Sequence, residues 1–356
     1  MRLIKHYKKG DKIMGENKKG KKALKVISIV MLSIIGFFVV VIAGVNVWFR
    51  APMGSYYAAS EKAFTIPGLS ANFVPQGFCY DEVEKQYLMS GYDSTGKASS
   101  IYVVHDEKDS QQVPTKRVAL AKSIGDIFDG HCGGVAQNGD YVYVANGSRI
   151  YVFSYADVKN AQDGDSVRYL GYKSITNDYD DVNASFVHTS NGKLYVGEFH
   201  DGKNYIVSPE HEITTQNGDV LYALMLEFDL DATAQYGIAQ DPTRAFAIPN
   251  KVQGVCVEGD YIYCSTSYGL SFSQIYKFDL TKSVNEGPKS VLGKDTALYS
   301  LDSVSLEKIY KTAPMSEELV YKDGKLYIMS EFACNKYIMG KFVEGQYCYA
   351  TDLDKM

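Results

Sequence analysis

A unit of three short β-strands recurs five times along this 356-residue chain, and that recurrence constrains the fold most. Residues 252–280 show the unit clearly: two strand-like runs at 255–257 and 261–264 flank a Glu-Gly-Asp turn, and a third run follows at 274–278. Short runs rich in Val, Ile and Tyr between Gly-containing turns are typical of antiparallel hairpins. The units begin about 55 to 68 residues apart, at Gln76, His131, Ser185, Gln253 and Glu317.

One further strand-like segment precedes each unit, which predicts four strands per repeat. These segments are residues 63–67, 117–120, 169–175, 244–249 and 308–312. A four-stranded sheet cannot bury both of its faces alone, so we expect an all-β fold in which the sheets pack as the blades of a five-bladed β-propeller. The first segment has no blade of its own and should complete the last one, closing the ring. The alternatives are six blades, or a β-sandwich or barrel with irregular hairpins.

The first fifty residues predict a membrane anchor. Residues 26–49 carry no charged side chain, and a helix of that length crosses the roughly 30 Å core of a bilayer. Five lysines between positions 18 and 25 place the N-terminus in the cytoplasm by the positive-inside bias. We expect a cytoplasmic tail (1–25), a single-pass signal anchor in the cell membrane (26–49), a linker (50–62) and an extracytoplasmic propeller (63–356). A cleaved signal peptide is the alternative.

The charge is unevenly distributed and argues against one class of partner. Residues 1–50 hold 11 of the 37 Lys and Arg but 2 of the 42 Asp and Glu, which leaves 26 basic and 40 acidic residues for the remainder. An acidic globular part repels phosphates, so nucleic acid is not expected as a partner. The same charge is compatible with Ca²⁺ or a cationic ligand.

The repeat also predicts where a ligand would bind. In a propeller, the loops leading into the innermost strands and the loops joining the second and third strands emerge together around the mouth of the channel. Polar groups that converge on a rigid concave scaffold predict a binding site. The ligand-binding candidates on this face are Gln76, Tyr92, His131, Glu198, Gln253, Tyr268 and Glu317.

Evidence for chemistry is weaker. His131 and Glu331 are candidates for a general acid or base, although a hydrogen-bonded structural histidine is the favoured interpretation of His131. Two carboxylates such as Glu198 and Glu331 could cleave a glycosidic bond only at a separation of about 5 to 9.5 Å. The candidate Ca²⁺ ligands carry hard oxygen atoms but lack the spacing of a calcium loop; they are Asp129, Asp181 and Asn183.

The cysteines indicate structural roles. Cys79, Cys256 and Cys264 stand in apolar strands and should pack as small hydrophobic residues. Cys334 and Cys348 flank two strands of the last repeat, and an extracytoplasmic domain would permit a disulfide between them. The sequence contains no C-x-x-C pair, no G-x-S-x-G elbow, no P-loop and no H-E-x-x-H motif. Whether the chain is an enzyme is therefore left open.

Some of these motifs resemble known propellers over roughly residues 60–355. The V-P-Q-G run at 74–77, the S-G-Y loop at 90–92 and the H-x-G-G run at 131–134 look like a family of uncharacterised bacterial secreted or membrane-anchored β-propellers. The chain is more remotely similar to gluconolactonase and strictosidine-synthase-like propellers, whose blade-opening P-E-G supplies a metal-ligating Glu. Gln76 replaces that Glu here. The Gln253-Gly254 pair and the following serine-rich loop are similar to plant-type glutaminyl cyclases, which are also five-bladed.

The leading hypothesis is a membrane-anchored propeller that binds a ligand, an envelope glycan or a protein partner on its channel-mouth face without catalysis. The alternative is a calcium-dependent hydrolase of the lactonase type, with His131 or Glu331 as its acid or base. Glycan binding is motivated by Tyr92, Tyr268 and an insertion at 202–220, because aromatic rings can stack on sugars.

Overall fold

A computed structural model describes residues 10–107, 115–178 and 180–356, which form two compact units, Met1–Pro52 and Met53–Met356. The first unit is dominated by the helix α1 (Gly10–Val45), followed by a helical turn at Asn46–Arg50. This helical stretch is long and apolar enough to cross a membrane, a property that signal sequences share. The helix predicted for 26–49 is thus present, and its orientation stays a prediction. Residues 1–9 of the predicted tail lie outside the described residues.

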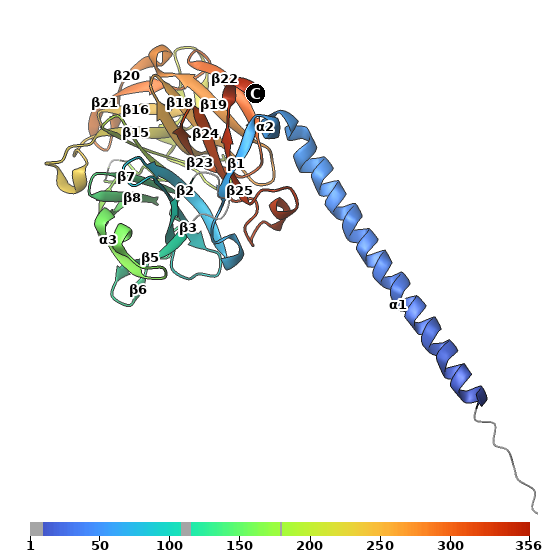
Figure 1. Ribbon diagram of the computed structural model, residues 1–356. Helices are drawn as coiled ribbons and strands as arrows, with labels where there is room; N and C mark the ends of the chain where they lie inside the picture. Colours follow the sequence, from blue (N-terminus) through green and yellow to red (C-terminus); the bar gives the residue numbers. More distant parts are fainter. Residues whose placement is uncertain (1–9, 108–114, 179) are drawn as a thin grey trace, which may run out of the picture. The chain divides into compact units, whose positions relative to one another are not determined.

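The second unit is all-β, and its described strands form five sets of four antiparallel neighbours (Figure 1). Each set is given from its innermost strand outwards. The first set is β2 (Phe73–Asp81), β3 (Gln86–Asp93), β4 (Ser100–His105) and β5 (Thr115–Ser123). The second set is β7 (Gly134–Asn138), β8 (Tyr141–Asn146), β9 (Arg149–Ser154) and β10 (Ser166–Ser174). The third set is β11 (Phe186–Ser190), β12 (Lys193–Gly197), β15 (Ala223–Asp229) and β16 (Arg244–Ile248). The fourth set is β17 (Val252–Glu258), β18 (Tyr261–Thr266), β19 (Ser273–Asp279) and β22 (Leu306–Thr312). The fifth set is β23 (Ser316–Lys322), β24 (Lys325–Ser330), β25 (Tyr347–Thr351) and β1 (Ser60–Thr65).

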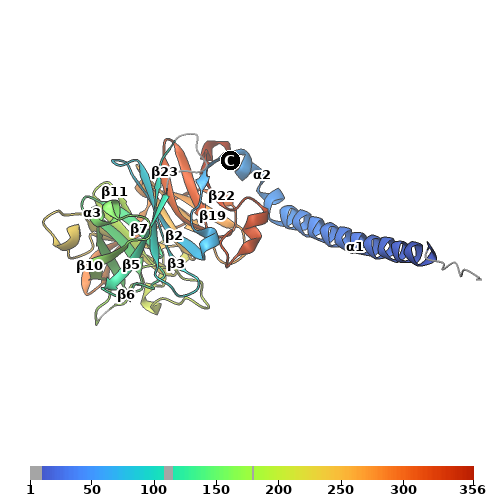
Figure 2. The same ribbon diagram turned by 60° about the horizontal axis from the view of Figure 1, so that its bottom comes forward.

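The innermost strands of the five sets form a closed ring, in which β2, β7, β11, β17 and β23 each contact the next and β23 returns to β2 (Figure 2). The ring is closed through both ends of the chain, because β1 pairs with β25 in the last set. The sequence predicted this closure from the unpaired segment 63–67, and the pairing confirms it. Met53 and Tyr56, within the segment expected to be a linker, are buried in this unit, where the short helix α2 (Gly54–Ala58) precedes β1.

The strand arrangement is that of a β-propeller, as predicted. The number of blades stays a prediction, because two parallel pairings join neighbouring elements beyond the five sets. The outer strands β5 and β10 pair over three residues, and β16 pairs with β21 (Lys294–Ser300) of a hairpin whose other strand is β20 (Val284–Val291). The repeat did not predict this hairpin. The remaining short elements are β6 (Asp126–Ile127), α3 (Tyr155–Asn160), β13 (Ile213–Thr214) and β14 (Val220–Leu221).

The core consists of five apolar clusters, and each lies between two adjacent sets of strands. The strand β8 shows why: Val142 and Val144 face the cluster shared with the first set, while Tyr143 and Ala145 face the cluster shared with the third. Successive side chains of a strand point to opposite faces, so a strand buried on both faces is apolar at nearly every position. The six cysteines are buried and free, so Cys334 and Cys348 form no disulfide in this structure.

Candidate functional site

A single buried carboxylate, that of Glu318 on β23, ties the inner strands together at the axis of the ring. Its Oε2 accepts hydrogen bonds from the backbone N–H groups of Phe78 (2.7 Å) and Val135 (3.1 Å), and its Oε1 accepts one from Val187 (3.1 Å). These donors belong to β2, β7 and β11. On β17, a Cβ added to Gly254 would collide with the Glu318 side chain, so that strand also touches it. Glu318 therefore contacts all four other inner strands.

A cavity of about 480 Å³ lies at the mouth of the ring, next to the inner-strand residues that contact Glu318. It is lined by residues that come before those contacts in the sequence and by the surrounding loops. Four of them occupy equivalent places at the start of four inner strands, namely Gln76, Gly133, Ser185 and Gln253. The walls come from the loops that lead into the inner strands, from the ends of the second strands and the loops after them, and from the segment after β24. They contribute Tyr92, His131, Asn146, Asn183, Phe199, Tyr205, Ser267, Tyr268, Met315, Glu331, Lys336 and Tyr337. The sequence-predicted residues Gln76, Tyr92, His131, Gln253, Tyr268 and Glu331 are thus brought together.

Glu331 is the acid of the cavity wall. Gln76 Nε2 donates a hydrogen bond to its Oε2 at 3.0 Å, and the other Gln76 Nε2 contact is to the backbone carbonyl of Pro75. Burial raises the pKa of Glu331 to about 7, although the charge of Lys336 and the Gln76 hydrogen bond oppose the rise. A carboxyl with that pKa is partly protonated near neutral pH, so it can both donate and accept a hydrogen bond.

Glu317 occupies the fifth position equivalent to Gln76 and Gln253. All three residues lie where the pairing of the inner strand with its neighbour shifts register, and such a bulge redirects a side chain. The Glu317 side chain is buried, with 1% of its surface exposed. Burial raises the pKa of its carboxyl well above the usual range, and the charges of Glu331 and Glu318 raise it further, so the three acids are neighbours.

His131 and Tyr92 form one wall of the cavity. Their rings stack with centroids 4.6 Å apart, and the Tyr92 Oη accepts a hydrogen bond from Lys336 Nζ at 2.7 Å. The His131 backbone N–H donates to Asn146 Oδ1 at 2.6 Å, which fixes the loop. Surrounding protein atoms and the Lys336 charge lower the pKa of His131 to about 4, so the imidazole is neutral at neutral pH. A neutral imidazole can accept a proton or a hydrogen bond.

A second group of aromatic side chains lines the cavity. Phe199 contacts the rings of Tyr205 and Tyr268, with centroids 5.3 and 6.1 Å away, and Asn204 Nδ2 donates to the Tyr268 Oη at 2.5 Å. Tyr205 belongs to the predicted insertion after β12. Two groups of aromatic side chains therefore line the cavity together with amide and carboxyl groups.

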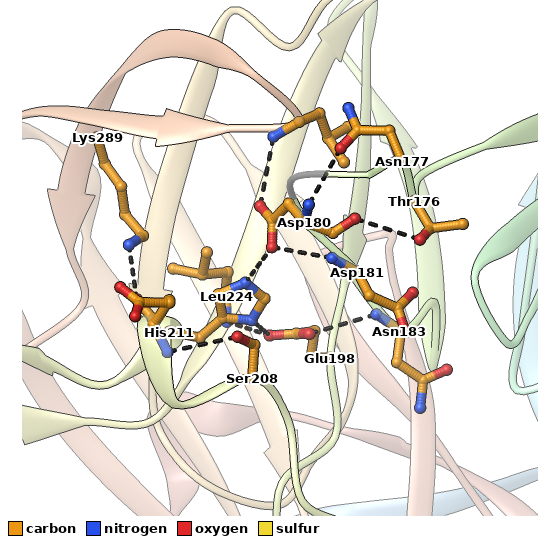
Figure 3. A network of polar contacts seen from close by, with 12 residues as sticks. Thr176, Asn177, Asp180, Asp181, Asn183, Glu198, Ser208, His211, Leu224 and Lys289 are labelled. Atoms are coloured by element: carbon orange, nitrogen blue, oxygen red, sulfur yellow. Dashed lines mark hydrogen bonds and ion pairs between the residues drawn. The ribbon is translucent and has the colours of Figure 1, made fainter.

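Glu198, another predicted binding residue, is not in the cavity but in a buried network (Figure 3). Its Oε2 is 2.8 Å from His211 Nδ1 and accepts the Leu224 N–H at 2.9 Å, while Asp180 Oδ1 lies 2.8 Å from His211 Nε2. Burial works to lower the pKa of His211, but the hydrogen bonds to Asp180 and Glu198 outweigh it and raise the pKa to about 9. A protonated histidine thus links two carboxylates and holds the insertion to the third set.

The candidate metal ligands are dispersed. Asp129 forms an ion pair with Lys122 at 2.9 Å, the Asp181 carboxylate accepts a hydrogen bond from Ser148, and the Asn183 backbone N–H donates to Glu198. Within residues 10–107, 115–178 and 180–356, no group of three or more His, Cys, Asp and Glu side chains is arranged to hold a metal ion. Of the three candidates, Asn183 alone lines the cavity.

Several residues of the site were not predicted. Lys336 and Tyr337 follow β24 in an irregular segment without a repeat signal, and Phe199 follows Glu198 directly. His211 lies in the insertion, and no local pattern connects it to Glu198. The insertion at 202–220, which the sequence suggested for glycan binding, supplies one of these residues, its single tyrosine Tyr205.

A scan against protein-family models found no match, and a search of curated proteins also found none. Among solved structures, the chain is similar to a glutaminyl cyclase of Myxococcus xanthus (12% identity, TM-score 0.39, covering 76% of this chain and 91% of the other). It is also similar to a Thermus thermophilus protein described as a putative oxidoreductase (glucose dehydrogenase), with 12% identity and a TM-score of 0.39 over 76% of this chain and 79% of the other. A structure of a nidogen/laminin complex is similar with 10% identity and a TM-score of 0.37, over 73% of each chain. Likenesses at this level assign neither an activity nor a ligand to this chain.

Proposed function

We propose that this chain is a membrane-anchored β-propeller that binds a carbohydrate in its mouth cavity without reacting with it. The observation that carries the proposal is the lining of the cavity, where aromatic rings occur together with amide and carboxyl groups. The C–H faces of a sugar ring pack on aromatic side chains, and its hydroxyl groups require donors and acceptors at fixed places. Gln76, Gln253 and Glu331 supply such groups, and Tyr92 and Tyr268 supply rings.

The anchor suggests where this ligand would be found. The apolar helix α1 and the lysines before its apolar part favour a domain outside the cytoplasm, in contact with the cell envelope. Glycans of the envelope are then the nearest source of carbohydrate. A protein partner that presents a sugar would use the same cavity.

The experiment is a binding titration with the full chain in detergent micelles. Soluble oligosaccharides of the envelope type should raise the melting temperature, because a ligand that binds only the folded state at 100 times its dissociation constant adds about 2.7 kcal/mol. Tyr92→Ala and Tyr268→Ala should weaken the effect by roughly tenfold or more in affinity. Tyr172→Ala, which changes an exposed tyrosine on β10, is the control and should bind normally. If no oligosaccharide shifts the melting temperature, the proposal is wrong.

A second candidate function is acid–base hydrolysis of the lactonase type. The observation that favours it is Glu331, because a carboxyl whose pKa is about 7 is suited to donate and accept protons at neutral pH. Neutral His131 lies in the same cavity as a second base. Lactone hydrolysis by the full chain, abolished by Glu331→Gln and retained by Glu258→Gln at the exposed end of β17, would establish the enzyme. Hydrolysis that is equal in both variants would exclude Glu331 from it.

A further inference from the structure

A short helical turn between β24 and β25, Ile338–Phe342, exposes large apolar side chains. Ile338 is 54% exposed, Met339 38% and Phe342 40%, so three such side chains reach solvent within five residues. Elsewhere in the described part of the propeller, exposed large apolar side chains occur singly or in pairs along the chain. Apolar residues gathered in one exposed place mark an interaction surface.

The turn is held from its inner side by other residues. The Gly340 N–H donates to the Phe332 carbonyl at 3.1 Å, and a Cβ added to Gly340 would lie 2.5 Å from the Phe332 backbone. Val343, which follows the turn, is buried. The packing of the propeller therefore gives no reason for Ile338 and Met339 to be apolar.

The charges near the turn suit a membrane surface. Lys336 and Lys341 lie between Glu331 and Glu344, and no Asp or Glu lies between those two acids, although the propeller as a whole is acidic. Glu344 itself forms an ion pair with Lys62 at 2.6 Å. Segments that lie in the interface of a bilayer combine exposed apolar residues with lysines, whose charges meet the lipid headgroups.

The chain enters the propeller beside this turn. Tyr56, at the entry, is buried, and its ring lies 5.8 Å from the ring of Tyr349. The Tyr349 Oη in turn donates to the Glu344 carbonyl at 3.0 Å, just past the turn. Only residues 50–52 separate the apolar stretch of the anchor from the buried Met53, and a step of four residues spans at most about 14 Å. An anchored propeller thus keeps the surface around its entry within reach of the bilayer.

We propose that Ile338, Met339 and Phe342 insert into the interface of the membrane that anchors the chain. This inference rests on the membrane anchoring in the proposed function and is independent of the carbohydrate ligand. Lys336 and Tyr337, directly before the turn, line the mouth cavity. The inserted turn would therefore hold one edge of the mouth at the membrane surface.

The test is tryptophan fluorescence of the full chain in nanodiscs of phosphatidylcholine and phosphatidylglycerol in equal parts, with plain or brominated acyl chains. Bromine quenches only indole rings that reach the lipid. Trp48 is the only tryptophan, so the wild type reports on the anchor. In a Trp48→Phe background, Ile338→Trp and Phe342→Trp should be quenched at least about twofold more than Val83→Trp, since interfacial segments bury their apolar face roughly 5–10 Å deep.

Val83 is the matched control, because it is 86% exposed in the turn between β2 and β3, at the opposite end of the ring from the mouth. Quenching of Ile338→Trp and Phe342→Trp that does not exceed that of Val83→Trp overturns the inference. Ile338→Trp decides alone if Phe342→Trp does not fold.

Two other outcomes also count against the inference. Blue-shifted emission without quenching would mean that protein covers the turn, as a second copy of the chain would. An unquenched Trp48 in the wild type would mean that the anchor fails, and this inference with it. The binding of oligosaccharides in micelles tests the carbohydrate part of the proposed function separately, so the two failures are distinguishable.

Discussion

The buried His211 provides the sharpest test of the structure. Its ring lies 2.8 Å from both Glu198 and Asp180, and its side chain is 1% exposed. Removing one partner of a buried ion pair costs about 3–5 kcal/mol, because a charge is left uncompensated. We expect His211→Gln to lower the free energy of unfolding by about that amount near pH 6.5, as measured by urea unfolding of the full chain in micelles, followed by circular dichroism.

The raised pKa of His211 makes the free energy of unfolding depend on pH. Because the pKa of His211 is about 9 in the folded state against 6.5 ordinarily, its stabilisation is fully present below about pH 6.5 and is lost as the pH rises through about 9. The difference corresponds to about 3 kcal/mol. Other groups also titrate in this range, so the relevant quantity is the gap between wild type and His211→Gln. That gap should shrink by about 3 kcal/mol between pH 6.5 and 10.

His188 is the matched control for this experiment. Burial lowers its pKa to about 4, so it is neutral in the folded protein and accepts the Val257 N–H at 3.2 Å. His188→Gln should therefore leave the loss of stability above pH 7 unchanged. If His211→Gln and wild type lose the same stability between pH 6.5 and 10, the network in Figure 3 does not contain a protonated histidine and the reasoning fails.

Three other predictions follow from the axis and the cavity. Glu318→Ala leaves three backbone N–H groups of different strands unsatisfied and should cost about 3 kcal/mol or more in urea unfolding, whereas Glu258→Ala on the surface should cost little. Gly254→Ala places a Cβ 2.5 Å from the Glu318 Cα and should cost about 1–3 kcal/mol, while Gly54→Ala, which meets open space, should be neutral. Calcium in excess should leave the melting temperature unchanged if the cavity holds a carbohydrate alone, and a saturable rise lost in Glu331→Gln would favour the calcium-dependent enzyme.

Much of the fold could be predicted because it is repeated and local. Alternating apolar residues and Gly-containing turns mark the inner hairpins, and the leftover segment before Gln76 indicated the closure by β1. The hairpin of β20 and β21 was missed because it breaks the repeat: Gly287 and Pro288 interrupt the alternation, and most of β20 is exposed or half-buried. A strand that buries little apolar surface leaves a weak signal in the sequence.

The site was predictable where topology alone decides it. Gln76 and Gln253 share a place in the repeat and His131 lies two residues before the equivalent Gly133, so a ring arrangement brings all three to one mouth. Glu198 has an equally suitable place at the end of β12, yet it does not line the cavity, because His211 from the insertion binds it. Pairings between an insertion and a repeat depend on the three-dimensional path of the loop, and nothing local in the sequence records them.

The buried acids of this protein differ in what satisfies them, and that difference separates scaffold from site. Glu318 accepts three N–H groups and contacts every other inner strand, so it is explained by the closure of the ring. Glu198 is explained by the charge of His211. Glu317 has no comparable partner within the described residues, although it is equally buried and lies one position from Glu318. Burial and the charge of the neighbouring Glu331, which does line the cavity, raise the pKa of Glu317 well above the usual range, so this carboxyl is buried in its protonated form.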